Sequence, residues 1–297
     1  MPKAFEGIFP PITTPFHEDG AVAYDRLAQN IEAWNKTDLS GYVVLGSNGE
    51  FVHLTLEEKL KVAATVVQSA GEDKRIILGT GCDSARETVD LTERTAKLGV
   101  HAAIVVTPYF YKGKMEAGPL IRYFEEVADR SPIPIILYNV PANTGVNMAV
   151  SAAIELTEHP NIVGMKDSSG LVAQIGEVIG GAPSDFSVFA GSAGFLLPAL
   201  VLGAAGGIVA LANIAPEECV RLYRLAQEGQ YEKAKDLQLR LIPINRAVTA
   251  TYGVPGLKKA MDMTGCYGGP PRAPLYPLAD AQTEALQAIL AKSGLWP

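Results

Sequence analysis

Cysteine and histidine are scarce in this chain of 297 residues. The three cysteines, Cys82, Cys219 and Cys266, are odd in number and far apart, so they form neither a disulfide framework nor a metal-ligand cluster. The four histidines show no ligand spacing either. We therefore predict no metal site, and the lack of a disulfide framework indicates a reducing compartment, the cytoplasm.

The chain also lacks an excess of basic residues and a long apolar run. With 25 lysines and arginines against 32 aspartates and glutamates, the net charge of −7 argues against nucleic acid or an anionic membrane surface as a partner. The longest apolar stretch, residues 195–209, contains Pro198 and several glycines, and it reads as a helix followed by a strand rather than a membrane span. Strand-like sequence begins by Gly7, which leaves no room for a signal or transit peptide.

What the chain does have is a regular succession of short apolar runs that alternate with amphipathic helical segments. Runs without polar alternation are typical of strands covered on both faces. Alternation of strand and helix gives a parallel sheet, and eight such units close into a barrel. The sequence therefore predicts an α/β fold, a (β/α)8 TIM barrel, with strands at 7–12, 41–45, 75–79, 102–106, 133–137, 162–165, 186–190 and 207–211.

The doubly wound open sheet is the alternative architecture. It requires a glycine-rich phosphate turn after the first strand, whereas residues 10–14 read Pro-Pro-Ile-Thr-Thr. Capping boxes at Thr55 with Glu58 and at Ser84 with Glu87 mark two of the helix starts between the strands. The barrel is the favoured architecture.

After the eighth strand the pattern becomes helical. We predict one barrel unit over residues 1–215, and a second unit over 216–297 that holds the last barrel helix and a helical appendage packed on the barrel. The helices of this second unit are expected at 216–228, 231–251, 256–263 and 279–292, with a Pro/Gly-rich segment at 265–277.

A lysine at the end of a buried strand is the first candidate catalytic group. The apolar run 162–165 ends on Lys166, and small polar residues follow at once. Desolvation at such a position disfavours the ammonium form and makes the amine a usable nucleophile, which can hold a ketone as a Schiff base. Taken alone, a lysine that extends from the strand end into solvent is the more common arrangement.

The other strand ends supply the rest of a site, because the carboxyl ends of barrel strands form the active-site face of this architecture. They supply an amine, phenols, hydroxyls and backbone amides, without an acidic pair or a phosphate loop: Ser47, Asn48, Tyr109, Phe110, Tyr111, Tyr138, Lys166, Ser168, Gly191 and Ile208. This set suits carbonyl chemistry in which Lys166 attacks the ketone of a 2-oxo acid. The amides of Ser47 and Asn48 are candidates for holding the carboxylate, and the Tyr138 hydroxyl for moving protons.

Each of these signals has a simpler interpretation on its own. The turn at 46–49 is by itself an ordinary turn, and Tyr138 is about as well explained as a strand-end aromatic whose hydroxyl finds a partner. Their convergence with Lys166 at one end of one barrel favours a catalytic site.

Several motifs resemble the dihydrodipicolinate synthase / N-acetylneuraminate lyase family of Schiff-base aldolases: residues 46–50, 107–109, 138–141 and 164–167. The resemblance runs over nearly the whole chain. It implies a (β/α)8 barrel, a homotetramer built as a dimer of dimers, and pyruvate bound as an imine to Lys166, with no other cofactor. It also implies that Tyr138 shuttles protons, that Ser47 and Asn48 bind the carboxylate, and that the backbone at Gly191 and Ile208 lines the pyruvate pocket.

Within the family, further segments look most like 4-hydroxy-2-oxoglutarate aldolase: 46–51, 79–84, 140–145, 161–170, 190–196, 253–262 and 267–275. Two positions depart from common family patterns. Asn143 stands where dihydrodipicolinate synthases place an arginine, which removes the natural partner of an aspartate semialdehyde carboxylate. Phe110 stands where the family commonly has a tyrosine that reaches a neighbouring subunit's site, so Tyr111, Ser47 or water must relay the proton, or the relay is shorter.

The resulting expectation is a class I aldolase that cleaves 4-hydroxy-2-oxoglutarate, or a close 4-hydroxy-2-oxo acid, to pyruvate and an aldehyde such as glyoxylate. Ser168 is the candidate for binding the distal end of the substrate. Within the class, the alternatives are a 2-keto-3-deoxy sugar acid aldolase and a dihydrodipicolinate synthase, the latter disfavoured by Asn143. Outside it, the alternative is a non-catalytic 2-oxo-acid-binding homologue.

Overall fold

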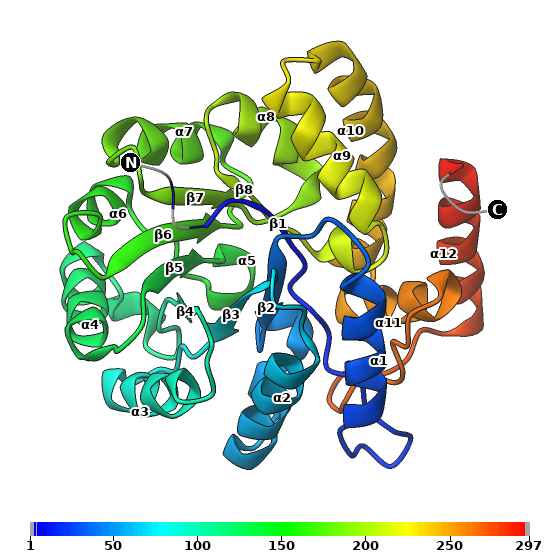
Figure 1. The fold of residues 1–297 in the computed structure, drawn as a ribbon, viewed down its shortest axis with the longest axis horizontal. Coiled ribbons are helices and arrows are strands. Elements are labelled where there is room, and N and C mark those ends of the chain that lie inside the picture. Colours follow the sequence, from blue (N-terminus) through cyan, green and yellow to red (C-terminus); the bar gives the residue numbers. More distant parts are fainter. Residues whose placement is uncertain (1–2, 4, 295–297) are drawn as a thin grey trace.

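The computed structural model describes residue 3 and residues 5–294, and its centre is a barrel of parallel strands (Figure 1). The eight strands form one sheet in the order β1-β8-β7-β6-β5-β4-β3-β2. They are β1 (Gly7–Phe9), β2 (Gly41–Val44), β3 (Arg75–Gly79), β4 (Ala102–Val106), β5 (Ile135–Asn139), β6 (Ile162–Asp167), β7 (Ser187–Ala190) and β8 (Gly206–Ile208). The predicted TIM barrel is confirmed.

The barrel closes between its first two strands. The Val43 amide donates to the carbonyl oxygen of Pro10 at 3.0 Å, and the Ile12 amide donates to the carbonyl oxygen of Val43 at 2.9 Å. Prolines are tolerated at positions 10 and 11 although proline has no amide hydrogen to donate. In this contact Pro10 contributes only its carbonyl oxygen. β1 therefore bonds to β8 on one side and, through the residues just after it, to β2 on the other.

Helices surround the strands in Figure 1 and connect successive ones. They are α1 (Tyr24–Trp34), α2 (Leu56–Ser69), α3 (Ala85–Ala96), α4 (Ala117–Arg130), α5 (Pro141–Thr144), α6 (Val150–Leu156), α7 (Val172–Gly181) and α8 (Leu196–Val201). The capping box of Thr55 and Glu58 is present with both hydrogen bonds. The Ser84 hydroxyl likewise accepts from the Glu87 amide at 3.2 Å.

The apolar residues divide into two layers because successive side chains of a strand point to opposite faces. One layer fills the barrel interior: Phe9, Val43, Ile77, Ile104, Ile136, Phe189 and Ile208 are among its members. The other lies between strands and helices and continues beneath the C-terminal helices.

The C-terminal region consists of α9 (Pro216–Gln227), α10 (Tyr231–Arg246), α11 (Gly253–Thr264) and α12 (Asp280–Ser293). In Figure 1, α9 and α10 lie along one flank of the barrel, and α12 lies at the outer edge of the molecule. α9 contacts both β1 and α8 of the barrel. The more extensive contacts of α12 are instead with the C-terminal helices α10 and α11. The continuous helix expected at 231–251 instead changes to a π-helical turn at Ala247–Thr251.

The strand ends differ from the expected ones in a way that matters for function. The fifth strand was expected to end at residue 137 and the sixth at 165, but β5 continues to Asn139 and β6 to Asp167. The strands extend because their polar ends pair in register, with Asn139 opposite Asp167. Tyr138 and Lys166 thus lie within the strands. The last strand, expected at 207–211, ends already at Ile208.

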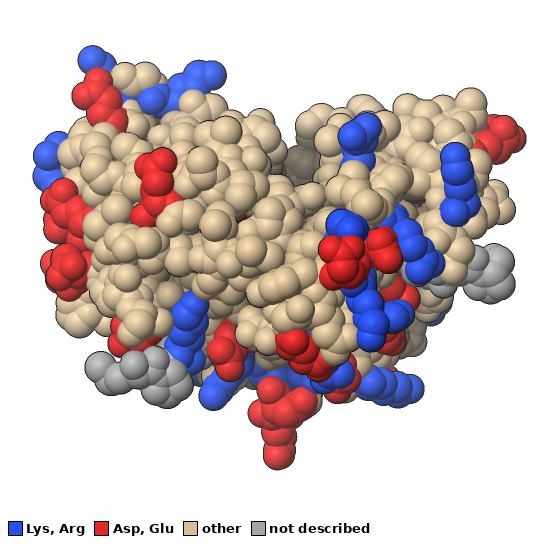
Figure 2. All heavy atoms as spheres, turned by 90° about the horizontal axis from the view of Figure 1, so that it is seen from above, with Lys and Arg blue, Asp and Glu red and all other residues tan. Residues whose placement is uncertain are grey.

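Charged side chains are dispersed over the surface. Figure 2 shows lysines and arginines interspersed with aspartates and glutamates on the face it displays, without a large patch of one sign. Within the described residues, no helix is both long enough and apolar enough to span a membrane.

Arg272, in the segment between α11 and α12, fastens the C-terminal region to the barrel. Its guanidinium bonds both carboxylate oxygens of Glu58 at 2.8 Å and the carbonyl oxygens of Gly20 and His53. The hydrogen bond from Arg272 is the main cause that lowers the pKa of Glu58 to about 2.

We predict that this contact loses its stabilising effect in acid. The folded-state pKa of Glu58 lies below its ordinary value of 4.5, so its contribution to stability is present above about pH 4.5 and is lost as the pH falls toward 2. Urea unfolding should show that Glu58→Gln lowers the free energy of unfolding by about 1–2 kcal/mol at pH 7 and by much less at pH 2. The exposed neighbour Glu57, changed to Gln, should show no such pH-dependent difference; an equal loss at both pH values for Glu58→Gln would contradict the assignment.

Candidate active site

Tyr138 and Lys166 lie side by side inside the barrel. β5 and β6 pair in register with Tyr138 opposite Lys166. The Lys166 Nζ lies 4.3 Å from the centroid of the Tyr138 ring. Both residues are buried, at 4% exposure for Lys166 and 7% for Tyr138. The predicted amine and phenol are therefore neighbours in a shielded position.

Ser47 approaches the same phenol from a different strand. β2 ends at Val44, and Leu45 takes a left-handed backbone conformation with φ 57°, which turns the chain into the short 3-10 helix Ser47–Gly49. The Ser47 hydroxyl lies 3.4 Å from the Tyr138 hydroxyl. A continuous row of Ser47, Tyr138 and Lys166 results.

This row borders a cavity of about 600 Å³, a volume typical of small-molecule sites. Of the residues predicted for the site, those that line this cavity are Ser47, Asn48, Tyr138, Asn143, Lys166, Ser168 and Gly191. Ile208 is fully buried in the barrel interior, and Ala210 lines the cavity near it instead. The structure therefore brings together most of the predicted set.

The aromatic residues predicted after the fourth strand occupy other places. Tyr109 lines an adjoining cavity of about 350 Å³, which shares Ser47 and Asn143 with the first. Phe110 and Tyr111 line neither cavity, and their side chains are 74% and 72% exposed. Burial is the main cause that raises the pKa of Tyr109.

The C-terminal region contributes a wall that the sequence analysis missed. The π-helical turn after α10 supplies Val248, Thr249 and Ala250 to the cavity, and Tyr252 and Leu275 follow. The segment has ordinary helical composition, so no local signal marks it. π-helical turns are frequent at functional sites.

Lys166 is the only ionisable cation among the described residues that line either cavity. No aspartate, glutamate or histidine lines them either. The described residues also contain no group of three or more His, Cys, Asp or Glu that could hold a metal ion. Lys166 is therefore the one basic side chain that the described lining of these cavities offers to a substrate.

A buried carboxylate behind Lys166 fixes the end of β6. Asp167 is 1% exposed and points away from the barrel interior, because it alternates with Lys166. It accepts hydrogen bonds from the Asn139 side chain at 3.0 Å, the Gln174 side chain at 2.8 Å and the Ser169 amide at 2.7 Å, and also from the Ser169 hydroxyl. These four bonds hold the backbone from which the lysine extends.

Gly191 sits where no side chain would fit. Its amide donates to the carbonyl oxygen of Asp167 at 2.7 Å, and a Cβ at this position would lie 2.0 Å from the Ser168 hydroxyl. Glycine is thus required for β6 and β7 to approach each other at the cavity floor.

A family model described as the dihydrodipicolinate synthetase family matches residues 4–293. The chain belongs to this family. A 4-hydroxy-tetrahydrodipicolinate synthase of Methanothrix thermoacetophila is 38% identical over 289 residues, which cover 97% of this chain and 97% of the relative.

Solved structures of the family show the same fold. The dihydrodipicolinate synthase of Aquifex aeolicus matches with a TM-score of 0.92 and 33% identity, over 98% of this chain and 99% of that one. A prophage protein of the family from E. coli K12, in complex with pyruvate, matches with a TM-score of 0.92 and 31% identity, over 98% and 99%. The similarity therefore spans barrel and C-terminal helices alike.

We predict that Asp167 is required for a stable site. Asp167→Ala leaves the donors of Asn139, Gln174 and Ser169 without their acceptor, and urea unfolding should show a loss of about 2–4 kcal/mol. Asp236→Ala, on the exposed face of α10, should change stability by less than about 0.5 kcal/mol. Equal small effects of the two variants would contradict the role assigned to Asp167.

Proposed function

We propose that the chain is a class I, imine-forming enzyme in which Lys166 attacks the C2 ketone of a 2-oxo acid. The observation that carries this proposal is the buried Lys166 amine, 4.3 Å from the Tyr138 ring centroid, at the border of the 600 Å³ cavity. Attack on the ketone and loss of water give a protonated imine, which serves as an electron sink. Family membership supports the same reaction class.

In the cleavage direction, Tyr138 takes the proton of the C4 hydroxyl. The C3–C4 bond then breaks, the aldehyde leaves, and the bonding electrons pass into the imine to give an enamine. Protonation at C3 and addition of water release pyruvate and restore the Lys166 amine. Ser47, whose hydroxyl lies 3.4 Å from that of Tyr138, is placed to pass the proton onward.

The turn at Ser47 and Asn48 is the proposed site of the C1 carboxylate. Backbone amides of such a turn bind anions, and both residues line the cavity with Lys166. Ser168 lines it as well and is the proposed contact for the distal end of the substrate. Binding at the turn places the C2 ketone toward the amine.

Two aldehyde partners are supported by different observations. The curated relatives named 4-hydroxy-tetrahydrodipicolinate synthase support condensation of pyruvate with aspartate semialdehyde, and they support it more directly than cleavage of 4-hydroxy-2-oxoglutarate. Asn143 in the cavity wall, at the position where dihydrodipicolinate synthases place an arginine, supports cleavage of a 4-hydroxy-2-oxo acid. The second proposal is therefore the aldolase reaction.

We also propose the homotetramer, a dimer of dimers, that the family resemblance implies. The large exposed side chains of Phe110 and Tyr111 on the loop after β4 support burial of this loop against another copy. Light scattering in solution should then give four times the mass of one chain.

We predict that pyruvate is trapped on Lys166. Mass spectrometry after incubation with pyruvate and borohydride should show one reduced pyruvate per chain on the peptide that contains Lys166. Lys166→Ala should lose both the adduct and turnover, because no amine remains to form the imine. Lys114→Ala, an exposed lysine, should retain both. A folded wild-type chain without any adduct would instead support the non-catalytic 2-oxo-acid-binding alternative.

A substrate panel separates the aldehydes. We expect condensation of pyruvate with aspartate semialdehyde, measured as loss of pyruvate, to exceed release of pyruvate from 4-hydroxy-2-oxoglutarate, measured with a coupled pyruvate assay. Faster release of pyruvate from 4-hydroxy-2-oxoglutarate would reverse the assignment in favour of the aldolase. Preferential cleavage of a 2-keto-3-deoxy sugar acid would identify the third family reaction.

A further inference from the structure

A buried glutamate follows directly after the proposed carboxylate-binding turn. Glu50 adopts a left-handed backbone conformation with φ 53°, and its side chain is 1% exposed. Its amide donates to the carbonyl oxygen of Ser47 at 3.2 Å, so its conformation is tied to that of the turn. A non-glycine residue keeps this conformation only where surrounding contacts hold it.

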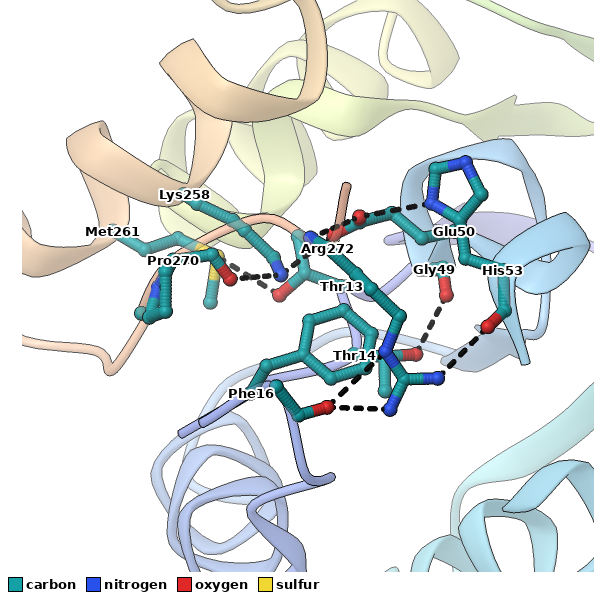
Figure 3. A network of polar contacts seen from close by, with 12 residues as sticks. Thr13, Thr14, Phe16, Gly49, Glu50, His53, Lys258, Met261, Pro270 and Arg272 are labelled. Atoms are coloured by element: carbon teal, nitrogen blue, oxygen red, sulfur yellow. Dashed lines mark hydrogen bonds and ion pairs between the residues drawn. The ribbon is translucent and has the colours of Figure 1, made fainter. Parts of the chain in front are cut away.

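The contacts that hold Glu50 come from the distant C-terminal region (Figure 3). The Nζ of Lys258, on α11, lies 2.6 Å from one carboxylate oxygen, and the backbone amide of Arg272 donates to the other at 2.9 Å. The His53 ring lies 3.3 Å from that second oxygen. The carbonyl oxygen of the preceding Gly49 accepts from the Thr14 hydroxyl at 2.7 Å.

Lys258 is itself fixed in place. Its side chain is 1% exposed, its Nζ donates to the carbonyl oxygen of Pro270 at 2.9 Å, and it lies 4.2 Å from the centroid of the Phe16 ring. Burial lowers the pKa of Lys258 to about 8 although Glu50 opposes this effect, and the nearby Arg272 lowers it further.

A buried ion pair of this kind contributes little to stability compared with an apolar pair of the same shape. Removing one partner, however, leaves an uncompensated charge in the interior. If Lys258 were neutral and apolar, the Glu50 carboxylate would have to move toward water. Because the Glu50 backbone is tied to Ser47, such a movement would displace the turn, while Lys166 on β6 would keep its place.

We propose that Lys258 and Glu50 are positioning residues that hold the Ser47–Asn48 turn in the geometry that binds the substrate carboxylate. This inference rests on the proposed function, in which the turn receives that carboxylate. Lys258 and Glu50 thus set the affinity for the 2-oxo acid although neither lines the cavity. They act on binding of the acid and leave the imine-forming amine unchanged.

Lys74 offers a matched control for a purely structural role. It is also a buried lysine, 4% exposed, whose Nζ donates to the carbonyl oxygens of Thr37 and Leu39 at 2.9 and 3.0 Å and pairs with Asp73. It precedes β3 and therefore lies at the opposite end of the barrel from the turn. Its loss should destabilise the fold without affecting the cavity.

The test compares wild type, Lys258→Met and Lys74→Met by trapping pyruvate with borohydride over a range of pyruvate concentrations. We expect Lys258→Met to raise the half-saturating pyruvate concentration by about tenfold or more. This is the loss of affinity expected when the displaced turn no longer makes one of its hydrogen bonds to the substrate carboxylate. Its adduct at saturation should still reach one per chain on Lys166. Lys74→Met should keep the wild-type half-saturation within about twofold, although thermal unfolding should show it to be destabilised.

The remaining outcomes are also decisive. An unchanged half-saturation for Lys258→Met, or an equal rise for Lys74→Met, would overturn the positioning role. Absence of any adduct in the wild type would instead overturn the proposed function. Should Lys258→Met not fold, Glu50→Gln replaces the carboxylate by an amide of the same shape and removes the charge that Lys258 pairs with. The same rise is expected there, since the residue tied to the turn has lost its ion pair with α11, and wild-type half-saturation would overturn the proposal.

Discussion

The site depends first on the in-register pairing of β5 and β6. This pairing sets Tyr138 beside Lys166 on the inner face of the barrel and Asn139 beside Asp167 on the outer face. One ladder thus creates both the reactive pair and the hydrogen-bonded pair that supports it. A slip of β6 by one residue would turn both Lys166 and Asp167 to the wrong face. The chemistry of the cavity is therefore specified by backbone register before any side chain adjusts.

Much of this architecture follows from the sequence. Eight apolar runs correspond to the eight strands, because a strand covered on both faces must be apolar throughout. The polar strand ends were harder to place. The apolar runs were expected to end at residues 137 and 165, just before Tyr138 and Lys166, and the extension of both strands depends on the pairing of Asn139 with Asp167. Most of the residues expected at the site line one cavity, whereas Phe110 and Tyr111 do not.

The parts that could not be predicted depend on contacts between distant segments. Glu50, Lys258 and Arg272 meet across more than two hundred positions of sequence, and nothing local to any of them marks the contact. The π-helical wall at Ala247–Thr251 has the composition of an ordinary helix. Tertiary packing decides both features. Similar motifs in relatives can indicate that such a region matters, but not which atoms it brings together.

The closure of the barrel has a consequence for how the chain folds. The amide of Gly7 bonds to the carbonyl oxygen of Ala205, and Val43 bonds to Pro10, so β1 joins the last strand to the second. Contacts between the two ends of a long stretch of chain form slowly, because a large loop must close first. During synthesis, β1 to β7 would therefore exist as an open sheet with exposed edges until β8 has left the ribosome. Protection of those edges, by chaperones or by early packing of the helices, becomes a requirement of this topology.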